Sequence, residues 1–210
     1  PASSAILACY YLMEMFQEAG LPDGVINFLP GDGKIVGDPI LNNSNLAGVH
    51  FTGSTKTFNH IWKTIGSNID NYKTYPRIVG ETGGKDFCLA HSSSDEEVLV
   101  TAMVRGAFEY QGQKCSAMSR AYIPSSIWSS VEDRLISELN TIKVGSPRDC
   151  SNFMNAVIDK SAFDNITSYI DYAMKDNDAK IIFGGGYDDS KGYFIEPTVI
   201  LTTNPNFKTM

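Results

Sequence analysis

Short apolar runs alternate with amphipathic segments along the first 80 residues, and this alternation constrains the fold more than any other feature. Apolar residues at three- and four-residue spacing predict helices over residues 3–18, where Ser3 or Ser4 is a candidate cap, and 56–65. Apolar runs bounded by glycine or proline predict strands at residues 25–29, 48–51 and 77–80. Helices and strands in alternation form a parallel sheet covered by helices, so we predict an α/β fold.

The second half of the chain alternates in the same way. Strands are predicted at residues 87–90, 119–123, 179–183 and 194–201. Helices are predicted from Asp95 onward, over residues 126–142, and around residues 163–173. The composition shifts at the glycine pair Gly83 and Gly84, so we predict two domains, residues 1–84 and 85–210.

Charge and composition exclude several classes of protein. The formal net charge is −7, whereas nucleic-acid-binding domains usually carry a basic excess, so no nucleic-acid partner is expected. No apolar run approaches the length of about 18 residues that a membrane span needs, and no secretory signal opens the chain. The four cysteines form no Cys-x-x-Cys pair, so neither a zinc site nor a disulfide framework is expected. The chain opens on Pro1 without methionine, and we expect it to be a piece of a longer polypeptide.

The first segment with possible chemistry is a predicted strand that runs through Gly53 into a helix. The first N–H groups of a helix lack partners within the helix and carry partial positive charge, so they can hold the pyrophosphate of a dinucleotide. Ser54 as an ordinary helix cap explains the same pattern. A second glycine-rich stretch, from Gly31 to Gly37, has the wrong spacing for a dinucleotide fingerprint and is read as a turn followed by a helix start.

The second segment is Glu81, which directly follows a predicted buried strand and precedes a glycine pair. A carboxylate that is partly withdrawn from water becomes a stronger base, as a general base requires. A turn whose glutamate faces water is an equally good interpretation.

The third segment sets Cys115 beside Lys114 in a stretch rich in glycine and amides. An ordinary thiol has a pKa of about 8.5, so only a few per cent is thiolate at neutral pH. A neighbouring cation, or N–H groups from a following helix, would increase that fraction. A loop thiol with no role also fits. Cys9 and Cys88 lie among apolar neighbours and are predicted to be small buried residues.

The order and spacing of these three segments resemble the aldehyde dehydrogenase superfamily over essentially the whole chain. The segment from Gly192 to Thr198 also resembles the strand that precedes that superfamily's ribose-binding loop. Phe58, where most members have glycine, and the run from Phe108 to Ala117 resemble one eukaryotic branch. That branch oxidises L-glutamate γ-semialdehyde, the open form of Δ1-pyrroline-5-carboxylate, in proline catabolism.

The resemblance implies part of a Rossmann-type NAD-binding domain in residues 1–84 and part of an α/β catalytic domain in residues 85–210. It implies Cys115 as nucleophile, Glu81 as the base that activates water, and Ser116 as a ligand of the substrate carboxylate. The cofactor would be NAD, bound along its pyrophosphate by Gly53, Ser54, Thr55, Lys56 and Thr57. The resemblance further implies a small aldehyde substrate, a homo-oligomer and the mitochondrial matrix.

The resemblance also implies that functional parts lie outside this chain. An oxyanion-binding asparagine would precede Pro1, and a ribose-binding Glu-x-Phe-Gly-Pro segment would follow Met210. We therefore predict that the 210 residues alone bind NAD weakly and turn over poorly.

Four alternatives stay open at this point. Cys115 could serve a cysteine hydrolase together with His50, His60 or His91. A CoA-acylating enzyme would share this framework, although Glu81 as a candidate base argues against it. The substrate could be another aldehyde, or the chain could be a folded module without activity.

Overall fold

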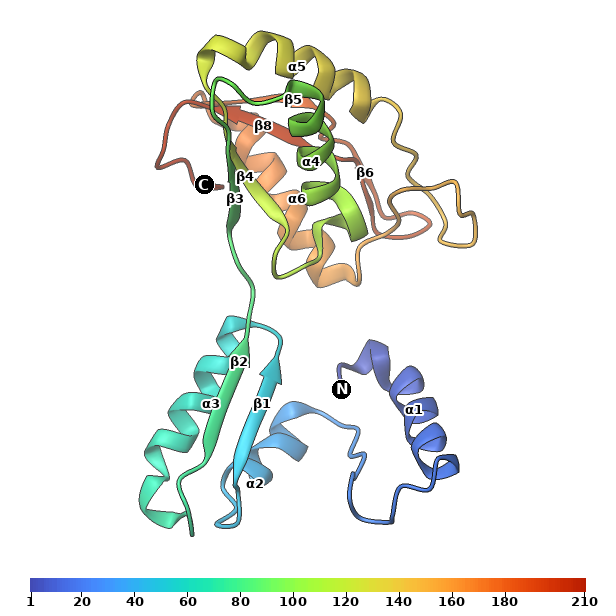
Figure 1. The fold of residues 1–210 in the computed structure, drawn as a ribbon, viewed down its shortest axis with the longest axis vertical. Coiled ribbons are helices and arrows are strands. Elements are labelled where there is room, and N and C mark those ends of the chain that lie inside the picture. The colour runs from blue at the N-terminus through green and yellow to red at the C-terminus, as the bar shows by residue number, and fades with distance from the viewer. The chain divides into compact units, whose positions relative to one another are not determined.

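The structure is a computed structural model that describes all 210 residues, and it divides into two compact units, Pro1–Thr82 and Gly83–Met210. The division falls two residues before the predicted boundary. Each unit contains a parallel strand pair joined through a helix, as the alternating pattern predicts (Figure 1). No helix of the chain combines the length and apolar character needed to cross a membrane.

The first unit is organised around the parallel pair β1 (Gly48–Thr52) and β2 (Arg77–Glu81), which α3 (Thr55–Ser67) connects. Ile61 and Ile65 on α3 are buried against Leu41 and the strand pair, so the amphipathic face of the helix covers the sheet. The remaining elements are α1 (Ile6–Glu18), α2 (Asp38–Leu41) and the short helical segments Ser3–Ala5, Gly33–Gly37 and Ile69–Asn71. The segment Gly33–Gly37 is helical and follows a turn, as predicted.

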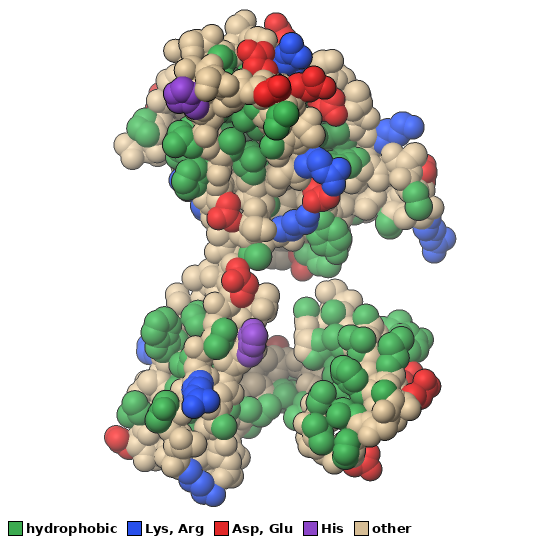
Figure 2. Space-filling model, viewed as in Figure 1, with side chains coloured by type: hydrophobic (Ala, Val, Ile, Leu, Met, Phe, Trp, Pro, Cys, Tyr) green, Lys and Arg blue, Asp and Glu red, His purple; other side chains and the backbone are tan.

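Two predictions for this unit are wrong. Residues 25–29 form no strand, and Val25 is 62% exposed, because a strand needs a hydrogen-bonded neighbour and the β1–β2 pair does not reach this run. Neither Ser3 nor Ser4 caps α1, because both lie inside a 3₁₀ turn that leads into it. The helix itself has no buried residue, and Figure 2 shows hydrophobic side chains gathered on its surface.

The second unit begins with the parallel pair β3 (Asp86–Leu89) and β4 (Met118–Tyr122), which α4 (Glu96–Phe108) connects. The helix α5 (Ser125–Leu139) packs on α4, and Val131, Leu135 and Leu139 on its inner face are at most 1% exposed. The spacing of these three residues is the stripe that predicted the helix. Cys88 is half-buried against this core, and Cys9 in the first unit is also half-buried, so neither is fully enclosed.

The remaining strands of the second unit pair in the antiparallel sense. The helix α6 (Lys160–Lys175) leads into β5 (Ala179–Phe183), which pairs with β8 (Val199–Thr202), while β6 (Tyr187–Asp188) pairs with β7 (Phe194–Ile195). The single strand predicted over residues 194–201 is therefore two strands. Pro197 lies between them and has no N–H to donate to a ladder, so the strand is interrupted there.

Candidate active site

Two of the predicted segments meet at the carboxyl edge of β1 and β2. Thr52 lies opposite Glu81 in the parallel ladder, and the Gly53 N–H donates to the Glu81 carbonyl at 3.1 Å. Parallel strands present their carboxyl ends at one edge, where open α/β sheets bind ligands. The glycine–serine–threonine segment and the main chain of Glu81 are therefore neighbours within the first unit.

The segment from Gly53 to Thr57 turns from β1 into the first turn of α3. The Ser54 hydroxyl accepts the Thr57 N–H at 3.1 Å, so Ser54 is the helix cap that the sequence allowed. The N–H groups of Thr55 and Lys56 have no partner within the chain. These two donors, with the hydroxyls of Ser54 and Thr57 beside them, can hold an anionic group.

Glycine is required at two positions of this edge because aromatic rings lie against the main chain. A Cβ on Gly53 would lie 2.7 Å from the ring of Phe51, and a Cβ on Gly80 would lie 2.3 Å from the ring of Phe58. The two rings stack with centroids 6.1 Å apart, and Trp62 continues the contact at 5.8 Å from Phe58. Phe58 therefore fills the space above β2 that a glycine at this position would leave open.

The side chain of Glu81 is exposed at the end of β2. The prediction that it follows a buried strand is wrong for this unit, because four of the five residues of β2 are exposed. Within residues 1–82 the Glu81 carboxylate is therefore not withdrawn from water, although a general base was expected to be.

Cys115 lies exposed in a turn that leads into β4. The turn follows three residues with left-handed backbone, Tyr110 (φ 54°), Gln111 (φ 57°) and Gly112 (φ 67°). A left-handed conformation costs a residue other than glycine about 1–2 kcal/mol, so this loop needs contacts that hold it. The element that directly follows the thiol is the strand β4 and not a helix, so the suggestion that N–H groups of a following helix assist the thiol is wrong.

The cation beside the thiol is already paired. Lys114 Nζ donates to the Glu109 carboxylate at 2.5 Å, and Arg105 donates to the other oxygen of the same carboxylate at 2.8 Å. The hydrogen bond from Lys114, with the charges of both cations, lowers the pKa of Glu109 below its ordinary value. Lys114 therefore ties the loop to the end of α4, and its charge is not free to act on Cys115.

The second glycine of the pair, Gly84, lies directly against the thiol loop. A Cβ on Gly84 would lie 2.7 Å from the carbonyl oxygen of Cys115, so only glycine allows this approach. The next residue, Lys85, is anchored at both ends. Its ammonium donates to the Thr209 carbonyl at 2.8 Å, and its carbonyl accepts from the Arg120 guanidinium at 2.5 Å. Partial burial, with the charge of Arg120 nearby, lowers the pKa of Lys85.

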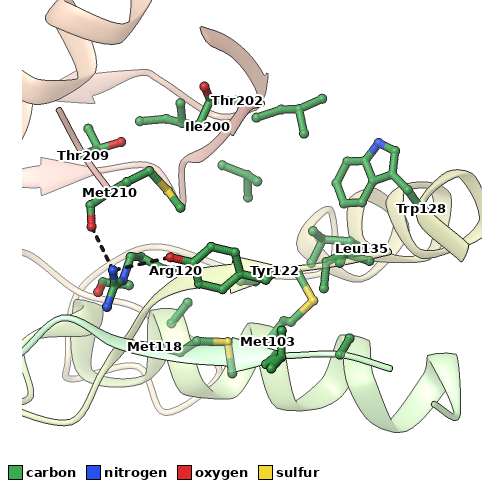
Figure 3. Close-up of a pocket in the computed structure, with 18 of the residues that line it drawn as sticks. Met103, Met118, Arg120, Tyr122, Trp128, Leu135, Ile200, Thr202, Thr209 and Met210 are labelled. Carbon is green, nitrogen blue, oxygen red and sulfur yellow. Dashed lines mark hydrogen bonds between the residues drawn. The ribbon is translucent and has the colours of Figure 1, made fainter. Parts of the chain in front are cut away.

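A cavity in the second unit has a volume of about 860 Å³. Figure 3 shows its lining, with Met103, Met118 and Leu135 on one side and Ile200 and Met210 on the other. Arg120 borders it and donates to the Met210 carbonyl at 3.2 Å. Neither Cys115 nor Ser116 lines this cavity, so it is not the surface on which the thiol would act.

The histidine of the second unit gives no support to a cysteine–histidine pair. In the second unit, His91 hydrogen-bonds the Ser93 hydroxyl at 2.9 Å and has no bond to Cys115. In the first unit, His60 pairs with Asp38 at 2.9 Å. No three side chains of His, Cys, Asp or Glu are grouped so that they could hold a metal ion.

The sequence comparisons agree with this arrangement. The model of the aldehyde dehydrogenase family matches residues 1–210. This chain belongs to the aldehyde dehydrogenase family. It is 54% identical over 212 residues to the mitochondrial delta-1-pyrroline-5-carboxylate dehydrogenase of Dictyostelium discoideum and 44% identical over 206 residues to the human protein of the same name. These matches cover 100% and 98% of the chain but only 38% and 37% of the relatives.

Solved structures show the same fold. The delta-pyrroline-5-carboxylate dehydrogenase of Mycobacterium tuberculosis, also solved with bound NAD, superimposes with a TM-score of 0.91 at 50% identity over 95% of this chain and 37% of that one. The Thermus 1-pyrroline-5-carboxylate dehydrogenase with bound NAD gives 0.88 at 32% identity over 95% of this chain and 38% of that one. The fold is therefore that of a partial aldehyde dehydrogenase domain.

Sequence reasoning proposed Cys115 as the nucleophile but missed the side chains that hold its loop. Glu109 and Gln113 fix the thiol loop through their side chains, and neither was given a role. The spacing of Arg105 and Glu109, four residues apart at the end of a predicted helix, was a usable signal for the ion pair. The bond from Gln113 to Ile158 joins residues far apart in sequence and left no signal.

Proposed function

We propose that this protein oxidises L-glutamate γ-semialdehyde, formed from Δ1-pyrroline-5-carboxylate, to L-glutamate with NAD, as a step of proline catabolism. The observation that carries the proposal is similarity along the whole chain, at 44–54% identity, to proteins named delta-1-pyrroline-5-carboxylate dehydrogenase. Because the chain spans 38% or less of those first relatives, the activity is proposed for the protein as a whole.

The edge formed by β1 and α3 fits the pyrophosphate of NAD. The two unpartnered N–H groups of Thr55 and Lys56 are donors, Gly53 leaves the approach free of a side chain, and the hydroxyls of Ser54 and Thr57 add polar contacts. When bound, NAD supplies the acceptor for the hydride that leaves the substrate. Lys56 adds a positive charge to the same turn.

Cys115 is the proposed nucleophile. Its thiolate attacks the aldehyde carbon, and the carbonyl oxygen becomes the oxyanion of a thiohemiacetal, which the main-chain N–H of Cys115 can help to bind. Loss of a hydride from that carbon leaves a thioester on Cys115. Water then attacks the thioester carbon and the carbon–sulfur bond breaks. The carboxylic acid is released, and the free thiol of Cys115 is restored. Exposure of Cys115 at the loop surface supports its access to a substrate.

Glu81 is the proposed base for the water. Its carboxylate is exposed at the end of β2, so it is open to a water molecule whose proton it can take up. Ser116, which is exposed beside the thiol, is the proposed donor to the substrate carboxylate.

The remaining proposals rest on the relatives. Several of them are named as mitochondrial proteins, which supports a mitochondrial location, and we propose the matrix. We also propose that the whole protein is a homo-oligomer that acts on a small aldehyde.

The test uses the full-length protein with NAD and glutamate semialdehyde, and it follows NADH formation. Cys115→Ser should lower kcat about a thousandfold or more, while Cys150→Ser, which removes the other exposed thiol, should leave it unchanged. Glu81→Gln should allow one turnover of NADH and then accumulate the acylated enzyme, detectable by its mass. A Cys115→Ser enzyme with the wild-type rate would overturn the proposal.

A further inference from the structure

The loop that carries Cys115 has an anchor that the mechanism does not use. The side-chain oxygen of Gln113 accepts the main-chain N–H of Ile158 at 2.9 Å, across 45 positions of sequence. The side-chain nitrogen of the same amide lies 3.4 Å from the carbonyl of Tyr110, the first left-handed residue of the loop. We propose that Gln113 is a positioning residue, which holds the strained loop against residues 153–158 so that Cys115 keeps its reactive geometry.

Residues 153–158 are a firm support for such an anchor. Phe153 and Met154 both donate to the Lys143 carbonyl, at 3.0 and 3.1 Å, and Val157 donates to the Tyr193 carbonyl at 2.9 Å. Met154 is 5% exposed and Val157 is 6% exposed. Ile158, which presents its N–H to Gln113, therefore follows a residue that is fixed both by packing and by a hydrogen bond.

The packing behind Val157 fixes this support to two further elements. Val157 belongs to a buried cluster with Phe163 and Ile170 on α6 and Ile195 on β7. Asp159, the residue after Ile158, caps α6 by accepting the Ala162 N–H at 2.8 Å. The Ile158 N–H, which donates to Gln113, therefore lies between the cap of α6 and a buried cluster.

The loop that carries Gln113, on the other side of this hydrogen bond, is the segment that needs support. Tyr110 and Gln111 hold left-handed backbone, and the turn from Lys114 to Ala117 is closed by one main-chain hydrogen bond at 3.2 Å. The side chain of Gln113 is half-buried, whereas Cys115 and Ser116 are exposed. Without the bond to Ile158, two side-chain contacts still hold this loop: the Glu109–Lys114 ion pair, which is exposed and weak, and the Gln111 amide, which accepts the Asn155 N–H.

The consequence for the reaction follows from geometry, and it rests on the proposed role of Cys115. A displacement of reacting atoms by about 1 Å costs on the order of a hundredfold in rate. A loop that loses its anchor still presents a thiol to solvent, but the sulfur no longer occupies one position relative to the substrate. The effect is therefore expected in kcat, with KM and the reactivity of the free thiol little changed.

The experiment compares three variants of the full-length enzyme. Gln113→Met keeps the length of the side chain and removes the accepting oxygen, Gln113→Glu keeps that oxygen, and Gln17→Met makes the same chemical change at an exposed site on α1. The steady-state constants for NAD-linked oxidation of glutamate semialdehyde are measured together with the rate of Cys115 alkylation by iodoacetamide. Exchange of the Ile158 amide with deuterium is measured in the wild type.

We expect Gln113→Met to lower kcat about 30- to 100-fold with KM and the alkylation rate within about threefold of wild type. Gln113→Glu should recover kcat to within about fivefold of wild type, because a carboxylate accepts the same N–H. Gln17→Met should match the wild type. The Ile158 amide should exchange far more slowly than an exposed loop amide.

Two results would overturn the inference while leaving the nucleophile in place: an unchanged kcat in Gln113→Met, or equal loss in Gln113→Glu. Rapid exchange of the Ile158 amide would also overturn it, and that measurement does not depend on whether a variant folds. Activity that survives Cys115→Ser would instead refute the proposed function on which the inference rests.

Discussion

Replacement of Gly80 by alanine tests the packing that shapes the edge of the first unit. Gly80 has no left-handed backbone, so alanine is conformationally acceptable there, and the effect of the substitution is steric. The added Cβ would lie 2.3 Å from two ring carbons of Phe58, well inside ordinary contact distance. Phe58 stacks on Phe51 and makes a tilted contact with Trp62, so its ring cannot turn away without disturbing both neighbours.

The expected cost is that of forcing extra volume into a packed site, about 1–3 kcal/mol. Amides that exchange by unfolding of this unit should then exchange about 5- to 150-fold faster, since 1.4 kcal/mol corresponds to a factor of ten. The amides to follow are those of the β1–β2 ladder, residues 48–52 and 77–81, measured on the 210-residue chain by deuterium exchange.

A matched control is available on the helix that connects the same strands. A Cβ on Gly66 in α3 would have nothing within 4 Å, so Gly66→Ala should slow ladder exchange by up to about fivefold through the helical preference of alanine. Phe58→Ala combined with Gly80→Ala should remove the clash and give a smaller loss than the two single changes predict together. Unchanged exchange in Gly80→Ala, or no suppression by Phe58→Ala, would refute the reasoning.

Three further predictions concern the core, the thiol loop and the helix cap. Leu135→Ala should destabilise the second unit by about 2–5 kcal/mol, because the side chain is 1% exposed. The measurement is urea unfolding followed by tryptophan fluorescence. Leu7→Ala, at a site 65% exposed, should leave that transition unchanged. The carboxyl of Glu109 should titrate in NMR with a pKa below 4.5, and Lys114→Met should raise it. Ser54→Ala should cost about 1 kcal/mol at the start of α3 and weaken NAD binding by the full-length enzyme, while Ser54→Thr should keep the cap.

The pH dependence of the loop follows from the direction of the Glu109 shift. Because the folded pKa is lower than the unfolded value, the ion pair contributes stability above about pH 4.5 and loses it as the pH falls through the folded pKa. In Glu109→Gln this contribution should be absent at neutral pH, and the variant and wild type should converge in acid. A Glu109 carboxyl that titrates at or above 4.5 would contradict the ion pair.

The local pattern of the chain was sufficient for most of the secondary structure. The stripe of Val131, Leu135 and Leu139 predicted α5, and the strand–glycine–serine sequence predicted the turn from β1 into α3. Such features follow from periodicity and capping, which act between residues close in sequence. The order of the segments around Glu81 and Cys115 was likewise enough to indicate the family that the comparisons establish.

Other features depended on partners that no local pattern contains. Residues 25–29 have the apolar composition of a strand but no neighbouring strand, and Pro197 divided a run that otherwise looked continuous. Only the tertiary structure decided that Lys114 is bound by Glu109 rather than directed at the thiol, and that Gln113 reaches Ile158. The physical reason is one of range along the sequence. Secondary-structure propensity and hydrophobic periodicity act over a few residues. The environment of a side chain is instead set by segments that packing brings together from distant parts of the chain.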